Sequence, residues 1–96
     1  MSDIVTEAVK ALNEKVDGGF AAGTAKFIIA DEGSIIVDAD GARASDDDAD
    51  VTLTADLETF QGMIEGNVNP TSAFMQGKLT VDGDMGLAMQ LGAALA

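Results

Sequence analysis

Carboxylates are the only ionisable side chains that this sequence holds in large numbers. Its 96 residues include 17 acidic and 5 basic side chains, with no histidine and no cysteine. The usual general base, the thiol nucleophiles, the Ser/His/Asp triad and the common zinc sites are therefore excluded. Four of the carboxylates fall in the turn-rich segment Asp46-Asp47-Asp48-Ala49-Asp50, where we expect no basic or apolar neighbours to shift their pKa values. We predict no catalytic residues, no cofactor and no enzymatic activity.

The acidic segment also resembles the beginning of a calcium-binding loop. Asp46, Asp48 and Asp50 stand at the first three ligand positions of such a loop. However, Val51 stands where the loop requires glycine, and Leu57 stands where it requires glutamate. We therefore predict no metal site and interpret the segment as a solvated surface.

The formal net charge of −12 limits the partners of this chain. Such a charge repels phosphate backbones, so we expect no nucleic-acid partner. Contact with a membrane would be transient, and it would need screening by salt, a neutral lipid surface or an apolar contact.

Length and composition predict a single soluble domain that spans residues 1–96. Apolar residues make up 47% of the chain, and the longest apolar run is far shorter than the roughly 18 residues that span a bilayer. The first residues, Met1-Ser2-Asp3-Ile4, show no secretory or transit signal. The expected location is the cytoplasm.

Hydrophobic periodicity divides the chain into helices and strands. Steps of three and four between apolar residues predict an amphipathic helix from Ile4 to Val16. Strand patterns cover residues 24–31, 34–38, 51–55 and 78–82, and helices that begin after Asp56, Asn69 and Asp84 cover residues 57–66, 71–76 and 85–96. This order predicts an α+β fold with helices on a mostly antiparallel sheet, in which the first three predicted strands form a meander.

The last predicted helix is unusual because Gln90 is its only plainly polar residue. A helix that is apolar on all sides needs apolar surroundings on more than one side, and this helix is too short to cross a bilayer. Met85 and Met89 are flexible side chains that suit irregular apolar partners, and Gly86 and Gly92 weaken the helix. We interpret the helix as a movable lid over an apolar cavity. Ordinary core packing and contact with a second subunit remain alternatives.

Two blocks of sequence, residues 49–56 and residues 63–89, resemble the sterol carrier protein 2 family. The most specific part runs from Asn69-Pro70 to Phe74, through Gly77-Lys78-Leu79, to Met85-Gly86-Leu87-Ala88. The resemblance implies a twisted five-stranded sheet covered on one face by helices. It also implies an apolar tunnel between the sheet and the helices that holds sterols, fatty acids, fatty acyl-CoA or phospholipids.

Carried over position by position, the resemblance implies a set of ligand-binding residues. These are Phe60, Met63, Ile64, Phe74, Met75, Leu79, Val81, Met85, Ala88, Met89 and Leu91. The chain departs from eukaryotic members in lacking a peroxisomal targeting tripeptide after Ala94-Leu95-Ala96, and it has no tryptophan or tyrosine. We therefore expect a free-standing, cytoplasmic member of bacterial or archaeal type.

The expected function is the binding and intracellular transfer of apolar ligands, gated by the last helix. Two alternatives remain open. The chain could present isoprenoid-quinone or other apolar intermediates to enzymes, which would make a lipid-metabolising enzyme its partner, or it could be a dimerisation scaffold. The sequence does not decide whether the chain is a monomer or a homodimer.

Overall fold

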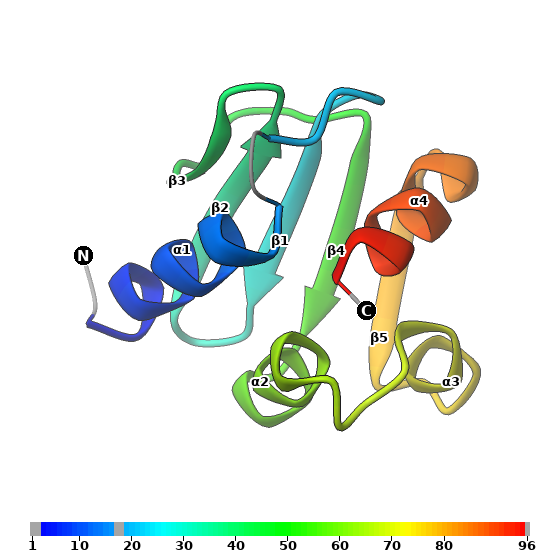
Figure 1. Ribbon diagram of the computed structural model, residues 1–96. Coiled ribbons are helices and arrows are strands. Elements are labelled where there is room, and N and C mark those ends of the chain that lie inside the picture. Colours follow the sequence, from blue (N-terminus) through cyan, green and yellow to red (C-terminus); the bar gives the residue numbers. More distant parts are fainter. Residues whose placement is uncertain (1–2, 17–18, 96) are drawn as a thin grey trace.

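One mixed sheet with helices against it makes up the described part of the chain, which is residues 3–16 and 19–95 of a computed structural model. Figure 1 shows α1 and α4 in front of the sheet, with α2 and α3 near one end of its strands. The elements are α1 (Asp3–Lys15), β1 (Ala25–Ile29), β2 (Gly33–Asp38), β3 (Gly41–Ala44), β4 (Val51–Ala55), α2 (Leu57–Glu65), α3 (Pro70–Met75), β5 (Leu79–Gly83) and α4 (Met85–Leu95). Ala96, the predicted end of the last helix, lies outside the described residues.

The strands are arranged in the order β3-β2-β1-β4-β5. All neighbouring strands are antiparallel except β1 and β4, which run parallel with Phe27 opposite Leu53. The α+β class and the mostly antiparallel, five-stranded sheet are thus confirmed. The predicted meander is wrong in one respect. The first three predicted strands are β1, β2 and β4, and β4 pairs in parallel with β1 instead of pairing with β2. Alternation in a sequence shows which side of a strand is buried but does not identify its neighbour.

The strand β3 was not predicted from the residues themselves. Its alanines lack the branched or aromatic side chains that favour strands. A long-range contact supports it, because the side-chain amide of Asn13 on α1 pairs with the backbone of Ala42. The amide nitrogen donates to the carbonyl oxygen of Ala42 at 3.0 Å, and the amide oxygen accepts from the backbone N–H of Ala42 at 2.8 Å.

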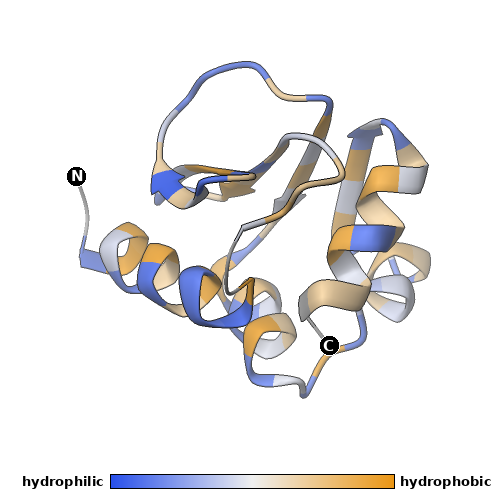
Figure 2. Ribbon diagram, turned by 45° about the horizontal axis from the view of Figure 1, so that its top comes forward, coloured by the Kyte–Doolittle hydropathy of each residue, from blue (hydrophilic) through white to orange (hydrophobic). Residues whose placement is uncertain are grey.

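The core lies between the helices and one face of the sheet. Phe27 on β1 meets Phe60 on α2 edge to face, with ring centroids 5.3 Å apart. Leu12 on α1 and Leu91 on α4 are fully buried in the same cluster. In Figure 2 the outer side of α1 is hydrophilic, whereas α4 shows hydrophobic or neutral colours along most of its length.

The three predicted cap residues each begin a helix. The side-chain oxygens of Asp56, Asn69 and Asp84 accept hydrogen bonds from the first turns of α2, α3 and α4, over 2.7, 2.8 and 3.2 Å respectively. These bonds stabilise the starts of α3 and α4, the helices that precede and follow β5 in the chain.

Candidate functional site

A groove lies between α3, β5 and α4, with β4 contributing to its floor, and we call it the α3–α4 groove. Its volume is about 480 Å³. Apolar residues predominate in its lining, which consists of Leu53, Asn69, Pro70, Thr71, Phe74, Met75, Leu79, Val81, Met85, Ala88, Met89, Gly92 and Ala93.

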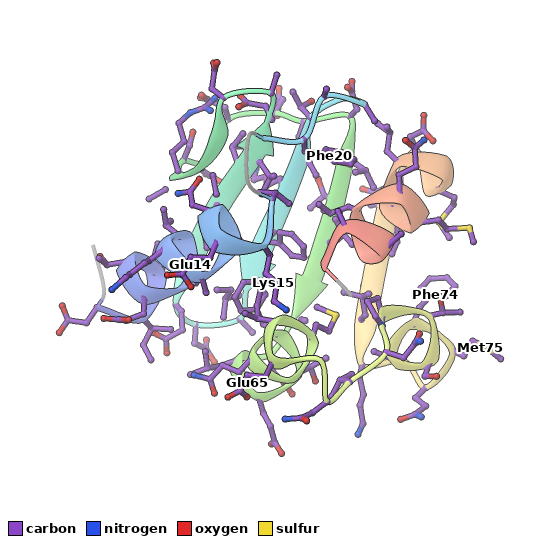
Figure 3. The ribbon with its side chains drawn as sticks, in the orientation of Figure 1. Glu14, Lys15, Phe20, Glu65, Phe74 and Met75 are labelled. Carbon is purple, nitrogen blue, oxygen red and sulfur yellow. The ribbon has the colours of Figure 1, made fainter. Side chains whose placement is uncertain are left out.

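The large apolar side chains that the described surface exposes all line this groove. Phe74, Met75, Met85 and Met89 expose 41%, 79%, 45% and 67% of their surface, respectively. Figure 3 shows Phe74 and Met75 on α3, at the side of the molecule next to β5 and α4. An exposed cluster of this kind is typical of a binding surface, since single exposed apolar residues are normally scattered.

The position of α4 explains why its methionines remain exposed. Leu87, Ala88 and Leu91 are buried, and α4 contacts β1, β4 and β5. Met85 and Met89 are four residues apart, so they lie on a common side of the helix, next to α3. This helix, apolar except for Gln90, thus has one side packed against the sheet and another side along the groove. None of the described helices is long and apolar enough to cross a membrane.

The polar groups of the groove are uncharged and few. Asn69 and Thr71 are the polar residues of its lining. The side-chain oxygen of Asn69 already accepts hydrogen bonds from the backbone N–H groups of Thr71 and Ser72. The remaining side-chain donors and acceptors in the lining are the amide nitrogen of Asn69 and the hydroxyl of Thr71.

The carboxyl groups with lowered pKa values lie outside the lining of this groove. The hydrogen bond from the backbone N–H of Thr59 lowers the pKa of the Asp56 carboxyl, and the positive charge of Lys78 lowers it further. Lys26 lowers the pKa of Asp46 through a hydrogen-bonded ion pair of 3.0 Å, so the expectation that no basic neighbour acts on the acidic segment is wrong at this residue. Neither carboxyl lines the groove. Within the described residues, no group of three or more acidic side chains could hold a metal ion.

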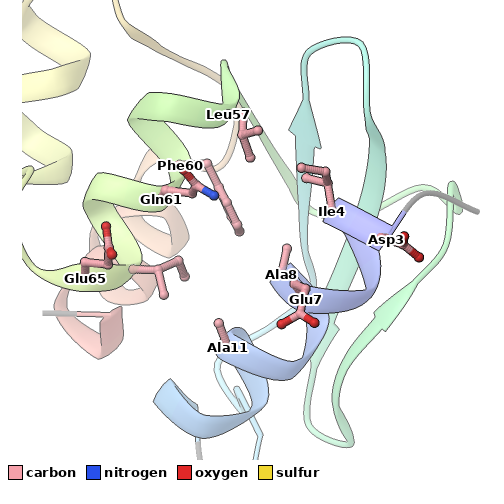
Figure 4. A pocket seen from close by; sticks show the side chains of 10 residues that line it. Asp3, Ile4, Glu7, Ala8, Ala11, Leu57, Phe60, Gln61 and Glu65 are labelled. Carbon is pink, nitrogen blue, oxygen red and sulfur yellow. The ribbon is translucent and has the colours of Figure 1, made fainter.

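A second groove, of about 400 Å³, lies between α1 and α2, and we call it the α1–α2 groove. Figure 4 shows its side chains, with Phe60 and Leu57 of α2 opposite Ile4 and Ala8 of α1. Unlike the α3–α4 groove, its lining includes the carboxylates of Asp3, Glu7 and Glu65.

Comparison with known proteins identifies the family. Residues 6–96 match the SCP-2 sterol transfer family. The chain belongs to this family. Among its relatives, human sterol carrier protein 2 is 51% identical over 47 residues, which are 49% of this chain and 9% of the human protein. In the zebrafish, human and Xenopus tropicalis relatives, the matched segments span only about a tenth of each relative's length.

Solved structures of SCP-2 proteins have the same fold. Sterol carrier protein 2 of Aedes aegypti, solved in complex with palmitate, matches with a TM-score of 0.78 and 23% identity, over 100% of this chain and 97% of that chain. Palmitated SCP2L2 of Aedes aegypti matches with a TM-score of 0.70 and 28% identity, over 99% of this chain and 95% of that chain.

The ligand-binding residues implied by the SCP-2 resemblance lie in three places. Phe60 and Ile64 line the α1–α2 groove, while Met63 and Leu91 are buried in the core, with 2% and 0% of their surface exposed. The other seven, which line the α3–α4 groove, are Phe74, Met75, Leu79, Val81, Met85, Ala88 and Met89. The role of all eleven in binding stays a prediction, as does the closure of the groove into a tunnel.

Sequence reasoning missed several lining residues. Gly92 and Ala93 follow Met89 by one helical turn, so helical spacing from Met85 could have found them. Asn69 and Thr71 carry a helix-start signal and lie within the block that resembles the family, but neither signal shows that their side chains line a groove. Leu53 could not be recognised, because its place beneath the groove depends on the pairing of β4 with β5.

Proposed function

We propose that this chain binds one apolar lipid molecule in the α3–α4 groove and carries it between membranes or enzymes without chemical change. The observation that carries this proposal is that Phe74, Met75, Met85 and Met89, the large exposed apolar side chains of the described surface, gather at one groove. A lipid in the groove would shield these side chains from water.

The energetics of such a site favour reversible transfer. Removing one CH₂ group from water contributes about 0.8 kcal/mol, both in a protein groove and in a membrane. Because the donor membrane offers nearly the same gain, the net free energy of moving a lipid into the groove is small. The polar contacts of the head group then determine which lipids are retained.

Two features of the family support a lipid ligand. Palmitated SCP2L2 of Aedes aegypti has this fold over 95% of its length and is 28% identical to this chain. Membership of the SCP-2 sterol transfer family supports an apolar ligand with carrier function and argues against catalysis. The fatty acid of the relative indicates that a single extended chain is a suitable test ligand.

We infer that α4 gates the groove. The inner side of α4 packs on the sheet through Leu87 and Leu91, while its outer side leaves Met89 67% exposed. Movement of this helix relative to α3 would widen the groove for entry and close it over a bound chain. Gly86 and Gly92 reduce the rigidity of α4, which favours such a movement.

Native mass spectrometry of protein purified without detergent tests the proposal. We expect one lipid per chain, and we expect Met89→Glu to reduce lipid occupancy about tenfold or more, because a charge would be buried against the ligand. Gln90→Glu is the matched control, since it adds the same charge to α4 at an exposed residue outside the lining. Occupancy in this control should equal that of the unmodified protein.

Two results would contradict the proposal. One is an unliganded chain that takes up no lipid from vesicles. The other is equal occupancy in Met89→Glu and Gln90→Glu. A lipid-free dimer that Met89→Glu dissociates would instead support the scaffold alternative.

A further inference from the structure

We propose that the α3–α4 groove selects lipids with uncharged head groups, such as alcohols, esters and sterols, over ionised fatty acids and acyl-CoA. This inference rests on the proposed function, and it narrows the class of ligand. It follows from the distribution of charge around the groove.

The elements that line the groove present no ionisable side chain to it. The sequences of β4, α3 and α4 contain no acidic or basic residue. β5 contains one, Asp82, which alternates with the lining residue Val81 and pairs with Thr52. Because successive residues of a strand point to opposite faces, Asp82 lies on the face of the sheet away from the groove.

The five basic residues of the chain lie elsewhere. Lys26 forms an ion pair with Asp46 at 3.0 Å, and Arg43 forms one with Asp38 at 2.7 Å. Lys10 and Lys15 are exposed on α1. Lys78 follows α3 in the chain, but its charge acts on Asp56 and it is not part of the lining.

A neutral head group suits the polar groups that remain. The amide nitrogen of Asn69 can donate to an alcohol, ester or sterol oxygen, and the hydroxyl of Thr71 can donate or accept. A carboxylate or phosphate at the same place would meet no cation in the lining, so any water that it lost on binding would not be replaced by a charged partner. The net charge of −12 also repels anionic ligands, and this repulsion weakens as salt is added.

The test compares dodecanol with dodecanoate, which share one alkyl chain, in their transfer from neutral phospholipid vesicles to the protein at about pH 7. Because both ligands are transferred from vesicles, the difference in their water solubility does not enter the comparison. We expect the equilibrium constant for transfer from vesicles to the protein to be about tenfold or more larger for dodecanol than for dodecanoate.

A pair of variants separates the charge of the groove from the charge of the whole molecule. Thr71→Lys places a cation in the lining, whereas Thr80→Lys places the same charge at an exposed residue of β5 that is not part of the lining. Thr71→Lys should reduce the preference for dodecanol about tenfold, and Thr80→Lys should reduce it much less.

The outcomes separate this inference from the proposed function. Equal transfer of both ligands, or equal effects of the two lysines, would overturn the inference and leave lipid binding intact. Transfer of neither ligand would overturn the proposed function and this inference with it.

Discussion

At the scale of residues, the side chains of the groove combine exposure with flexibility. Full burial of a methionine or phenylalanine side chain stabilises by roughly 1.5–3 kcal/mol, so leaving Met75 and Met89 largely exposed forgoes part of that gain. Methionine also adapts its shape to irregular apolar partners. We therefore expect the groove to accept acyl chains and ring systems of several shapes, with selection resting mainly on the head group.

The cap residue Asp56 should make stability depend on pH in a predictable direction. Because the hydrogen bond from Thr59 lowers the pKa of Asp56 in the folded state, its contribution is fully present above the unfolded-state pKa of about 3.9. It is lost as the pH falls through the lower, folded-state pKa. Asp56→Ala should lower the Tm by about 5 °C near neutral pH, and thermal denaturation should show this difference shrinking in acid.

The matched control for this prediction is Asp82→Ala. It removes the same charge from an exposed position of β5 without removing a helix cap. A Tm difference between Asp56→Ala and the unmodified protein that stays constant down to about pH 2 would contradict the prediction.

At the scale of elements, the junction between α3 and α4 is where gating can be tested. A Cβ atom added at Gly92 would lie 3.4 Å from Cβ of Pro70, which is an ordinary van der Waals contact. Gly92→Ala should raise the free energy of unfolding by up to about 1 kcal/mol, because alanine favours the helix more than glycine does. If α4 moves away from α3 to admit a lipid, the same variant should slow lipid release, measured as transfer to acceptor vesicles.

Gly86→Ala serves as the control for Gly92→Ala. It makes the same change in the same helix, but the added Cβ would lie 3.1 Å from a side-chain oxygen of Asp84 and within 4 Å of no atom of α3. Lipid release that is unchanged or faster in Gly92→Ala would exclude movement at this junction.

The sequence predicted most elements but not all of their neighbours. The starts of α2, α3 and α4 could be predicted because cap residues such as Asp56 act on the next turn of the chain. β3 depends on its contact with Asn13 on α1, and the place of β4 beside β1 depends on a parallel pairing between distant residues. Long-range contacts of this kind leave no periodic signal in the strand itself.

The candidate site was predicted to a similar extent. Seven of the eleven implied residues line one groove, because they belong to the contiguous segment from α3 to α4. Periodicity could not show that Leu91 packs in the core while Met89 borders the groove, since α4 is apolar on both sides. Likewise, helical spacing within α2 could not show that Phe60 and Ile64 face α1.

At the scale of the whole molecule, an uncharged groove lies in a strongly acidic protein. The net charge of −12 opposes binding to anionic membranes, and this opposition weakens with salt. Exchange of lipid is therefore expected mainly at neutral lipid surfaces, where the exposed side chains of α3 and α4 can make contact. The same charge opposes association between copies of the chain through the apolar groove.

The methionines report most directly on whether the α3–α4 groove is the lipid site. Met75, Met85 and Met89 line it, whereas Met63 is 2% exposed in the core and Met1 lies outside the described residues. In protein labelled with ¹³C at the methionine methyl groups, titration with dodecanol should shift the NMR signals of Met75, Met85 and Met89 and leave that of Met63 nearly unchanged. Saturating dodecanol that shifts none of these three signals, or that shifts only Met63, would contradict a lipid site between α3 and α4.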